Sequence, residues 1–470
     1  TKTFYGFPVL LMPYIGALKA YIFYPIFAVF GVGAVTMRLP DILLAAAGLY
    51  LLYRLASGEV GRRLGLAIVL LTGLDASFIM FTRLDNGPVV LDFLLKMLGV
   101  FVLLRFVRAQ KLWWLAAFWL CMFLGTFNKL NFIWDVNALA GAFVLAYGLL
   151  LWRKTSRAQR LWALAISAAG YLLSIGYYLY INKTYHLGSK LGFVGWRVVY
   201  NNLVELVQGS WFYHYAFSPA KVGSNNVFWV MVIVIVAGAL CLVQAVRRRK
   251  DFDARFVRFF MFALAAGVLL LVQIAVTPQA TAGWHYFSVY PLFGAAFVLA
   301  LYLICRVAVP QWRQFGYGVA AAAVFVLCLY QLNVYHQNVA AFNRPPGKVI
   351  WSTAIYQLID YAKAQHTSFV SMDWGTQTQL LGFDPVPGKY IEMFGPLDVS
   401  SPEQAAADFQ KYATNLPGAL YVTHAPGEQL TPTTAQFFAL ARTHGYHPVL
   451  VKTLYDQRLP VFQVYKLQQG

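Results

Sequence analysis

The stretch VFWVMVIVIVAGALCLVQAVRRRK, residues 227–250, decides the fold class of this protein. Residues 227–246 carry no charged side chain, and four cations follow at 247–250. An α-helix rises about 1.5 Å per residue, so a helix of this length crosses the ~30 Å apolar core of a bilayer. The basic residues then remain in water at one membrane face. The stretch predicts a transmembrane helix that ends at a charged loop.

Other apolar stretches repeat this pattern and predict a transmembrane domain of about ten spans over residues 38–335. The composition agrees, because 60% of the 470 residues are hydrophobic, only 12% are charged and the mean hydropathy is +0.58. Soluble domains carry roughly 25% charged residues. The predicted spans are 38–56, 64–82, 88–107, 112–128, 132–152, 161–181, 227–246, 256–277, 286–305 and 317–335.

The charges of the connecting loops predict the orientation. Every second loop is basic, and such loops belong on the cytoplasmic side. The alternate loops then face outward, and so do residues 1–37 and everything after 335. The net charge of +19 is explained by these loops, so we expect no nucleic-acid partner. The sequence predicts a multi-pass protein of the cytoplasmic (inner) membrane. Its basic loops hold Arg54, Arg62 and Arg63; Arg105, Arg108 and Lys111; Arg153, Lys154, Arg157 and Arg160; Arg247–Lys250; Arg306 and Arg313.

The two ends of the chain differ from the predicted bundle. Residues 1–37 are expected to form an outer juxtamembrane segment, with the short apolar stretch 15–30 lying along the membrane surface. A chain that starts outside at Thr1, without methionine, predicts a further span upstream. Residues 336–470 alternate predicted helices and strands, which indicates a small extracytoplasmic α/β domain with a mixed sheet.

The outer turn 81–88, FTRLDNGP, is the sharpest candidate for chemistry. Arg83 and Asp85 lie two residues apart there, suited to a phosphate group and an acid/base step respectively. Equally, Asp85 ahead of Pro88 is good helix N-cap chemistry, and the sequence does not decide between the two. On the following helix, Asp92 and Lys96 are four apart and are expected to pair with each other.

Three further outer segments hold candidate binding residues. Lys129 lies in a polar cluster around Trp134, for which substrate binding and interfacial anchoring are both open. Residues 284–286, Trp284-His285-Tyr286, precede a span and suit either an aromatic belt or a donor to phosphate. The long loop 182–226 mixes aromatics with amides, which fits sugar binding or a helix at the headgroups. No HExxH, Walker A, GxGxxG or GxSxG motif occurs, so a divalent metal is possible but has no motif.

Several short segments, in order along the chain, resemble polytopic glycosyltransferases of the C type. This superfamily includes the protein O-mannosyltransferases and the lipid A aminoarabinose transferase. The outer C-terminal α/β domain also resembles that of many bacterial members. The segments that carry the resemblance are 14–21 continuing to 30–31, 37–40 opening a span that ends at 53–56, 83–88, and 284–286 entering a span through 290–291.

The resemblance implies an inverting enzyme that moves a sugar from a polyprenyl-phosphate carrier to a lipid, glycan or protein acceptor at the outer membrane face. It implies Asp85 as the acid of the outer loop. Lys19, Arg83 and His285 are implied as donor-phosphate ligands, and Trp284, Tyr286 and Lys129 as further substrate contacts.

The sequence departs from the family at one point. Family members place their principal catalytic aspartate in the first outer loop, whereas this chain has no acidic residue before Asp41. That acid is therefore expected upstream of Thr1. The alternative is a catalytically silent assembly partner, or a transporter, on the same scaffold.

Overall fold

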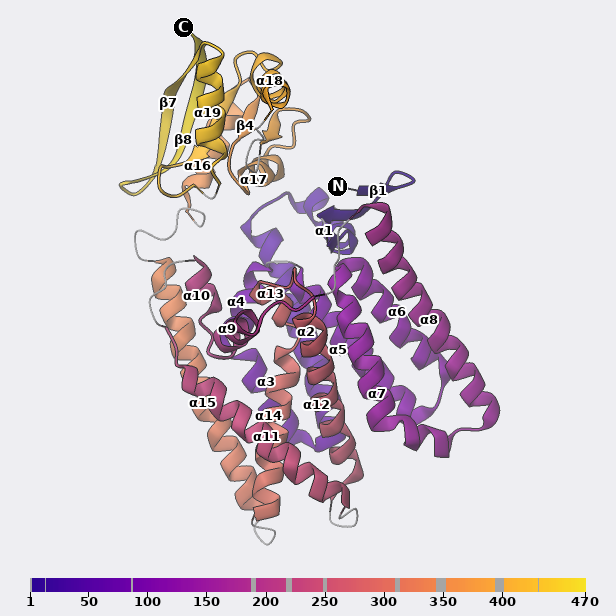
Figure 1. The fold of residues 1–470 in the computed structure, drawn as a ribbon. Coiled ribbons are helices and arrows are strands. Elements are labelled where there is room, and N and C mark those ends of the chain that lie inside the picture. The colour runs from indigo at the N-terminus through magenta and orange to yellow at the C-terminus, as the bar shows by residue number, and fades with distance from the viewer. Residues whose placement is uncertain are drawn as a thin grey trace. The chain divides into compact units, whose positions relative to one another are not determined.

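The computed structural model describes residues 2–12, 14–85, 88–186, 192–216, 222–247, 252–308, 313–343, 352–393, 401–429 and 431–470. The chain forms two compact units (Figure 1). The first unit comprises Thr1–Tyr215 and Pro219–Asn338, and the second comprises Ala216–Ser218 and Val339–Gly470.

The first unit is a bundle of helices, and each predicted span coincides with helical structure. Neighbouring helices pack as antiparallel pairs, for example α5 on α6 and α7 on α12. The helices that coincide with the predicted spans are α2 (Ala34–Val60), α3 (Arg62–Gly73) with α4 (Ala76–Leu84), α5 (Val89–Ala109), α6 (Leu112–Asn128), α7 (Ile133–Lys154), α8 (Arg157–Thr184), α11 (Asn225–Arg247), α12 (Ala254–Ala275), α14 (Tyr290–Ala308) and α15 (Arg313–Phe342).

By length and composition, seven helices in the described part of the chain can each cross a membrane, or up to eight if the bent pair α3 and α4 counts as one. Helix α6 is short for a span at 17 residues. Helix α5 carries Asp92, Lys96, Arg105 and Arg108 within its 21 residues. The protein is a multi-pass helical membrane protein, which confirms the predicted fold class.

A bend of 62° separates α3 from α4, where the sequence predicted one continuous span over 64–82. Asp75 lies at the break, fully buried, and caps α4 by accepting a 2.8 Å hydrogen bond from the Phe78 amide. Its other carboxylate oxygen accepts a 2.6 Å bond from the Tyr290 hydroxyl of α14. Gln331 of α15 accepts from the free Ala76 amide at 3.2 Å. The break is thus satisfied by polar groups of two neighbouring helices, as apolar surroundings require.

A three-stranded sheet that the sequence did not predict precedes helix α1 (Leu18–Phe30). Its strands are β1 (Lys2–Phe4), β2 (Phe7–Met12) and β3 (Ile15–Gly16), in that order. Ile15 pairs with Lys129, and the Leu130 amide donates to the Tyr14 carbonyl at 2.9 Å. These contacts hold the N-terminal segment against the end of α6. They require close approach, because a Cβ on Gly16 would lie 1.8 Å from the Phe127 carbonyl oxygen.

We therefore expect Gly16→Ala to separate β3 from α6 and to lower the thermal unfolding midpoint in detergent, because backbone atoms cannot yield to a methyl group. Gly176→Ala, within α8, is the matched control, since nothing lies within 4 Å of the methyl group it would add. Differential scanning fluorimetry of the two variants measures the effect. Equal midpoints would contradict the proposed docking of the N-terminal segment.

Two short helices, α9 (Trp196–Val207) and α10 (Trp211–Ala216), lie in the long connection that follows α8, and α13 (Gly283–Tyr286) precedes α14. The Asn202 side chain of α9 donates to the Thr281 carbonyl at 3.1 Å, and Trp211 of α10 packs on Trp284. The described part of the predicted loop 182–226 is thus largely helical and packs against the loop that carries Trp284.

The second unit is the predicted α/β domain. Its sheet has the order β5-β4-β6-β8-β7, parallel across β5, β4 and β6 and antiparallel beyond, so the sheet is mixed. Helix α17 was not predicted, because its apolar residues show no clear helical stripe. The elements are α16 (Ala354–Ala364), β4 (Phe369–Ser371), α17 (Thr376–Phe383), β5 (Tyr390–Glu392), α18 (Pro402–Phe409), β6 (Leu420–His424), α19 (Thr433–Thr443), β7 (Tyr446–Asp456) and β8 (Leu459–Gln469).

Candidate active site

Lys19, at the start of α1, lies between two carboxylates of other helices. Its ammonium group is 3.0 Å from Asp41 Oδ2 of α2 and also contacts Asp85 Oδ2 after α4. The two aspartate side chains are nearly buried, at 3% and 2% exposure. Phe23 packs beneath the ammonium, 4.6 Å from ring centre to nitrogen. We call Lys19, Asp41 and Asp85 the carboxylate cluster. Sequence reasoning missed Asp41, whose only signal was a charge one residue after Pro40 in an apolar span.

Local backbone geometry explains how Asp85 reaches this cluster. The residue ends α4 in the left-handed region, at φ 44°, where aspartate is better tolerated than most side chains. Its Oδ1 accepts a 2.9 Å bond from the Val90 amide at the start of α5. Arg38 donates to the Leu84 carbonyl at 2.8 Å and so closes the end of α4. Asp85 therefore stabilises a helix start with one oxygen and contacts Lys19 with the other. Helix capping and an acid/base step, the two roles that the sequence left open for Asp85, are therefore compatible.

A second set of polar side chains fills the bundle beside this cluster. Lys96 of α5 is 2.9 Å from Asp135 Oδ1 of α7, and it donates to the Ser288 carbonyl at 2.6 Å. Ser288 donates to Asp135 Oδ2 at 2.6 Å. The predicted pairing of Asp92 with Lys96 is wrong, because Asp92 instead accepts a 2.8 Å bond from Asn128. Sequence spacing along one helix could not show that α7 and Ser288 supply Lys96 with better partners.

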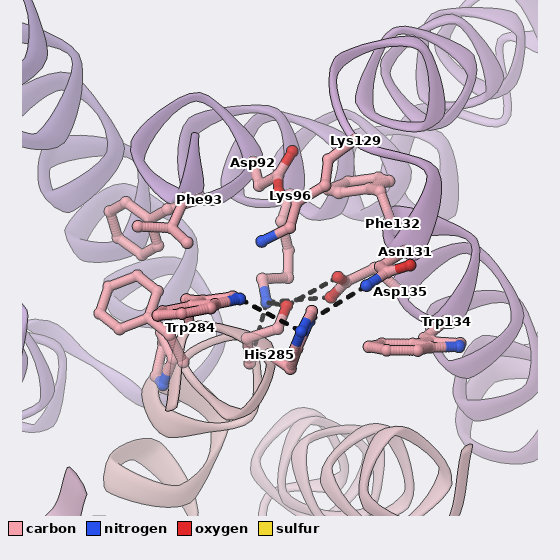
Figure 2. Close-up of a pocket in the computed structure, with 14 residues that line it drawn as sticks. Asp92, Phe93, Lys96, Lys129, Asn131, Phe132, Trp134, Asp135, Trp284 and His285 are labelled. Carbon is pink, nitrogen blue, oxygen red and sulfur yellow. Dashed lines mark hydrogen bonds and ion pairs between the residues drawn. The ribbon is translucent and has the colours of Figure 1, made fainter. Parts of the chain in front are cut away.

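Lys129 follows α6 and lines a cavity beside these side chains. Only 3% of the residue is exposed, and its ammonium group forms no hydrogen bond and no ion pair with any residue that the structure describes. Figure 2 shows its side chain entering the cavity between Asp92 and Lys96. Burial lowers the pKa of Lys129, while the nearby carboxylates of Asp92, Asp85 and Asp135 oppose that shift. These carboxylates therefore offset part of the cost of burying the ammonium group, although none of them forms a direct ion pair with it.

His285 forms one wall of this cavity, and both of its ring nitrogens are engaged (Figure 2). Trp284 Nε1 donates to Nε2 at 3.1 Å, and the Asn131 side-chain amide lies 3.0 Å from Nδ1. An indole nitrogen only donates, so Nε2 of His285 is an acceptor, and the atom of Asn131 nearest Nδ1 is its amide nitrogen Nδ2. Burial, with a smaller effect from Lys129, lowers the pKa of His285 to about 3. His285 is therefore a neutral ring at physiological pH.

This shift predicts a pH-dependent stability. Between the unfolded pKa of 6.5 and the folded value of about 3, the unfolded chain binds a proton that the folded chain does not. Stability is thus lost as pH falls through that range. We expect the unfolding midpoint of the wild type to drop more steeply from pH 7 to pH 5 than that of His285→Gln, measured by scanning fluorimetry. Parallel curves would show that His285 is accessible to protons in the folded protein.

Three other candidates from the sequence, Arg83, Trp284 and Tyr286, lie outside the carboxylate cluster. Arg83, in the last turn of α4, donates to the hydroxyl of Tyr335 on α15 instead of joining the carboxylate cluster. Tyr286 is fully buried, and Trp284 packs on Trp211 and on the His285 ring. Of these two aromatic residues, Trp284 lines the cavity.

The carboxylate cluster and the Lys129 cavity adjoin each other. Tyr14, on the segment that leads to Lys19, packs on His285 with ring centres 5.5 Å apart. Asp85 is close enough to Lys129 to stabilise its charge. The space left in the cavity is about 20 Å³, room for one water molecule. In the described residues no group of three or more His, Cys, Asp or Glu side chains is arranged to hold a metal ion.

This arrangement of helices has counterparts among solved structures, although no protein-family model and no curated protein matches the sequence. ArnT from Cupriavidus metallidurans bound to undecaprenyl phosphate aligns with 97% of this chain and 88% of its own, at 13% identity and a TM-score of 0.53. The same protein in the apo state aligns over 95% and 87% of the two chains, at 14% identity and a TM-score of 0.52. At such identities the likeness concerns the fold. The chain therefore shares its fold with ArnT.

Proposed function

We propose that the protein is a membrane glycosyltransferase that uses a polyprenyl-phosphate-linked sugar. The single observation that carries the proposal is the buried ammonium group of Lys129, which forms no direct ion pair with any described residue. Lys129 lies beside the carboxylate cluster. ArnT, a solved structure with a similar fold, was crystallised with undecaprenyl phosphate. A buried site with an unpaired cation and adjacent carboxylates suits phosphate departure coupled to proton removal.

In the proposed reaction, the oxygen of an acceptor hydroxyl attacks the anomeric carbon of the donor sugar. Asp85 accepts the proton of that hydroxyl. The bond between that carbon and the phosphate oxygen breaks, and the polyprenyl phosphate leaves with the electron pair. Lys129 and Lys19 stabilise the negative charge that develops on the leaving phosphate. Attack opposite the leaving group inverts the anomeric centre.

Lys19 connects the two parts of this mechanism. In the structure it contacts both Asp41 and Asp85, so an arriving phosphate competes with these carboxylates for its ammonium group. If Lys19 turns to the phosphate, Asp85 loses its counter-ion and becomes a better base. Asp41 remains a carboxylate neighbour of the Lys19 ammonium group after that group has turned. We assign His285 a positioning role, because a neutral ring held at both nitrogens orients Trp284 and Asn131 along the cavity.

The proposal places the site at the outer face of the cytoplasmic membrane. The basic loops support this orientation, since Arg108, Arg157 and Arg306 lie at helix ends opposite those that carry Asp85, Lys129 and His285. The C-terminal domain is then extracytoplasmic. Arg83 is kept as a candidate phosphate ligand at the rim of the site, where its bond to Tyr335 would have to open.

A donor screen tests the function. Purified full-length protein in nanodiscs is given radiolabelled sugars on undecaprenyl phosphate, with lipid, glycan and peptide acceptors, and transfer is followed by chromatography. We expect one donor to be consumed with release of undecaprenyl phosphate. Binding of undecaprenyl phosphate without turnover of any donor would instead support the catalytically silent partner.

A further inference from the structure

A second cavity, outside the carboxylate cluster and the Lys129 cavity, lies between α9, α10 and the start of α11. Its volume is about 510 Å³, within the range of about 300–1,000 Å³ that is usual for small-molecule sites. The lining combines polar side chains with the apolar Val204 and Val222. We call this cavity the α9–α11 groove; it is lined by Tyr200, Asn201, Glu205, Gln208, His214 and Asn226, among others.

Glu205 is the charged group of the groove, and it is held in place. Its carboxylate is 3.3 Å from His214 Nδ1 of α10, and both side chains are partly exposed, at 30% and 24%. One carboxylate oxygen is thus oriented by the imidazole. The carboxylate is a strong acceptor for hydroxyl groups that enter the groove.

The other lining groups are amides and an aromatic ring. Asn201 and Asn226 are exposed at the groove and present both donors and acceptors, while Tyr200 packs against Phe228 and Trp229 at its base. The backbone around the groove is already satisfied, since the Tyr330 hydroxyl accepts from the Ser224 amide at 2.8 Å. A fixed carboxylate, free amides and a supported ring together match the alternating hydroxyls and apolar faces of a sugar.

We propose that the α9–α11 groove binds a hydroxyl-rich carbohydrate, which is the acceptor of the transfer reaction. The assignment of this carbohydrate as the acceptor rests on the proposed function, and on helices that pack against both the groove and the loop that carries His285. Helix α9, which carries Glu205, also carries Asn202, whose side chain donates to the Thr281 carbonyl. Trp211 of α10 packs directly against Gly283, where an added Cβ would lie 2.4 Å from the indole nitrogen. The groove and the His285 loop therefore share α9 and α10 as one packed layer.

Sugar binding is measured directly, without turnover. Saturation-transfer NMR on the full-length protein in nanodiscs uses methyl glycosides of glucose, galactose, mannose and N-acetylglucosamine as probes. We expect at least one probe to bind and its affinity to fall about tenfold or more in Glu205→Gln, because a hydrogen bond to a charged group is lost. Asn226→Leu, an exposed change that leaves the fold intact, is expected to weaken the same probe.

Two controls separate this proposal from the proposed function. Arg197→Gln alters an exposed residue of α9 that does not line the groove, and it should leave sugar binding unchanged. Asp85→Asn should abolish transfer yet keep sugar binding, so the groove can be established even if the protein proves not to be an enzyme. Failure of every probe to bind, or binding that is equal in the wild type, Glu205→Gln and Asn226→Leu, overturns the groove as a carbohydrate site.

Discussion

Replacing Asp85 by asparagine should reduce the turnover of the proposed transfer reaction by about 10²–10⁴-fold, the usual contribution of a general base. The variant keeps an oxygen for the Val90 amide, which Asp85 Oδ1 accepts at 2.9 Å, so the junction of α4 and α5 should survive. It loses the negative charge that contacts Lys19 and the ability to take a proton. The affinity for the donor should change little, or rise slightly as Lys19 is released.

The matched control for that variant is Asp384→Asn in the C-terminal domain. Asp384 also forms an ion pair, with Lys389 at 3.1 Å, and accepts a hydrogen bond from Tyr390, which lowers its pKa. Loss of this pair should leave turnover at the wild-type level. If Asp85→Asn retained full turnover while its unfolding midpoint matched the wild type, Asp85 would be a helix-capping residue only.

Replacing Lys129 by glutamine should weaken the binding of undecaprenyl phosphate about ten- to a hundredfold. A charge-assisted hydrogen bond contributes about 1.5–3 kcal/mol, and each 1.4 kcal/mol corresponds to roughly tenfold in affinity. Lys129 has no direct ion pair among the described residues to break when the phosphate arrives, so its ammonium group can bind the ligand directly. Quenching of tryptophan fluorescence on titration with undecaprenyl phosphate measures it, because Trp134 and Trp284 line the same cavity.

Lys389→Gln is the control, since it removes a lysine of the C-terminal domain that pairs with Asp384. Raising the salt concentration should affect the wild type less than it would a surface site, because buried charges are screened weakly. An unchanged affinity in Lys129→Gln would remove this lysine from the phosphate site and leave Lys19 as the remaining candidate.

The helices of the bundle could be predicted from the sequence because lipid imposes a simple rule on each segment separately. Long uncharged stretches such as 227–246 and the cations after them needed no knowledge of the rest of the chain. The same holds for the C-terminal domain, where the alternation of helices and strands predicted the mixed sheet that the structure has. The N-terminal sheet was missed because β1 and β3 have only 3 and 2 residues, too few for a periodic pattern.

The sequence predicted only part of the candidate site, because the residues of the site come from segments that are far apart along the chain. Asp85, Lys129 and His285 were each singled out as a charge or ring in an outer segment, and Lys19 was singled out by the family resemblance. Asp41 was not, because a single aspartate in an apolar span looks like any buried polar residue until Lys19 is placed beside it. The pairing of Lys96 with Asp135 required the packing of α5 on α7, which no spacing along the sequence encodes.

The bend at Asp75 also bears on how the chain enters the membrane during synthesis. Helices α3 and α4 have 12 and 9 residues, or about 18 and 14 Å, so neither can cross a bilayer alone. The translocon must therefore accept them as one segment with an aspartate near its centre, a cost of about 2.5–3.5 kcal/mol. Tyr290, the hydroxyl donor to Asp75, is 215 residues further along. At ~5–20 residues per second it emerges roughly 10–40 s later, so the bent segment must wait for α14 before its buried carboxylate is satisfied.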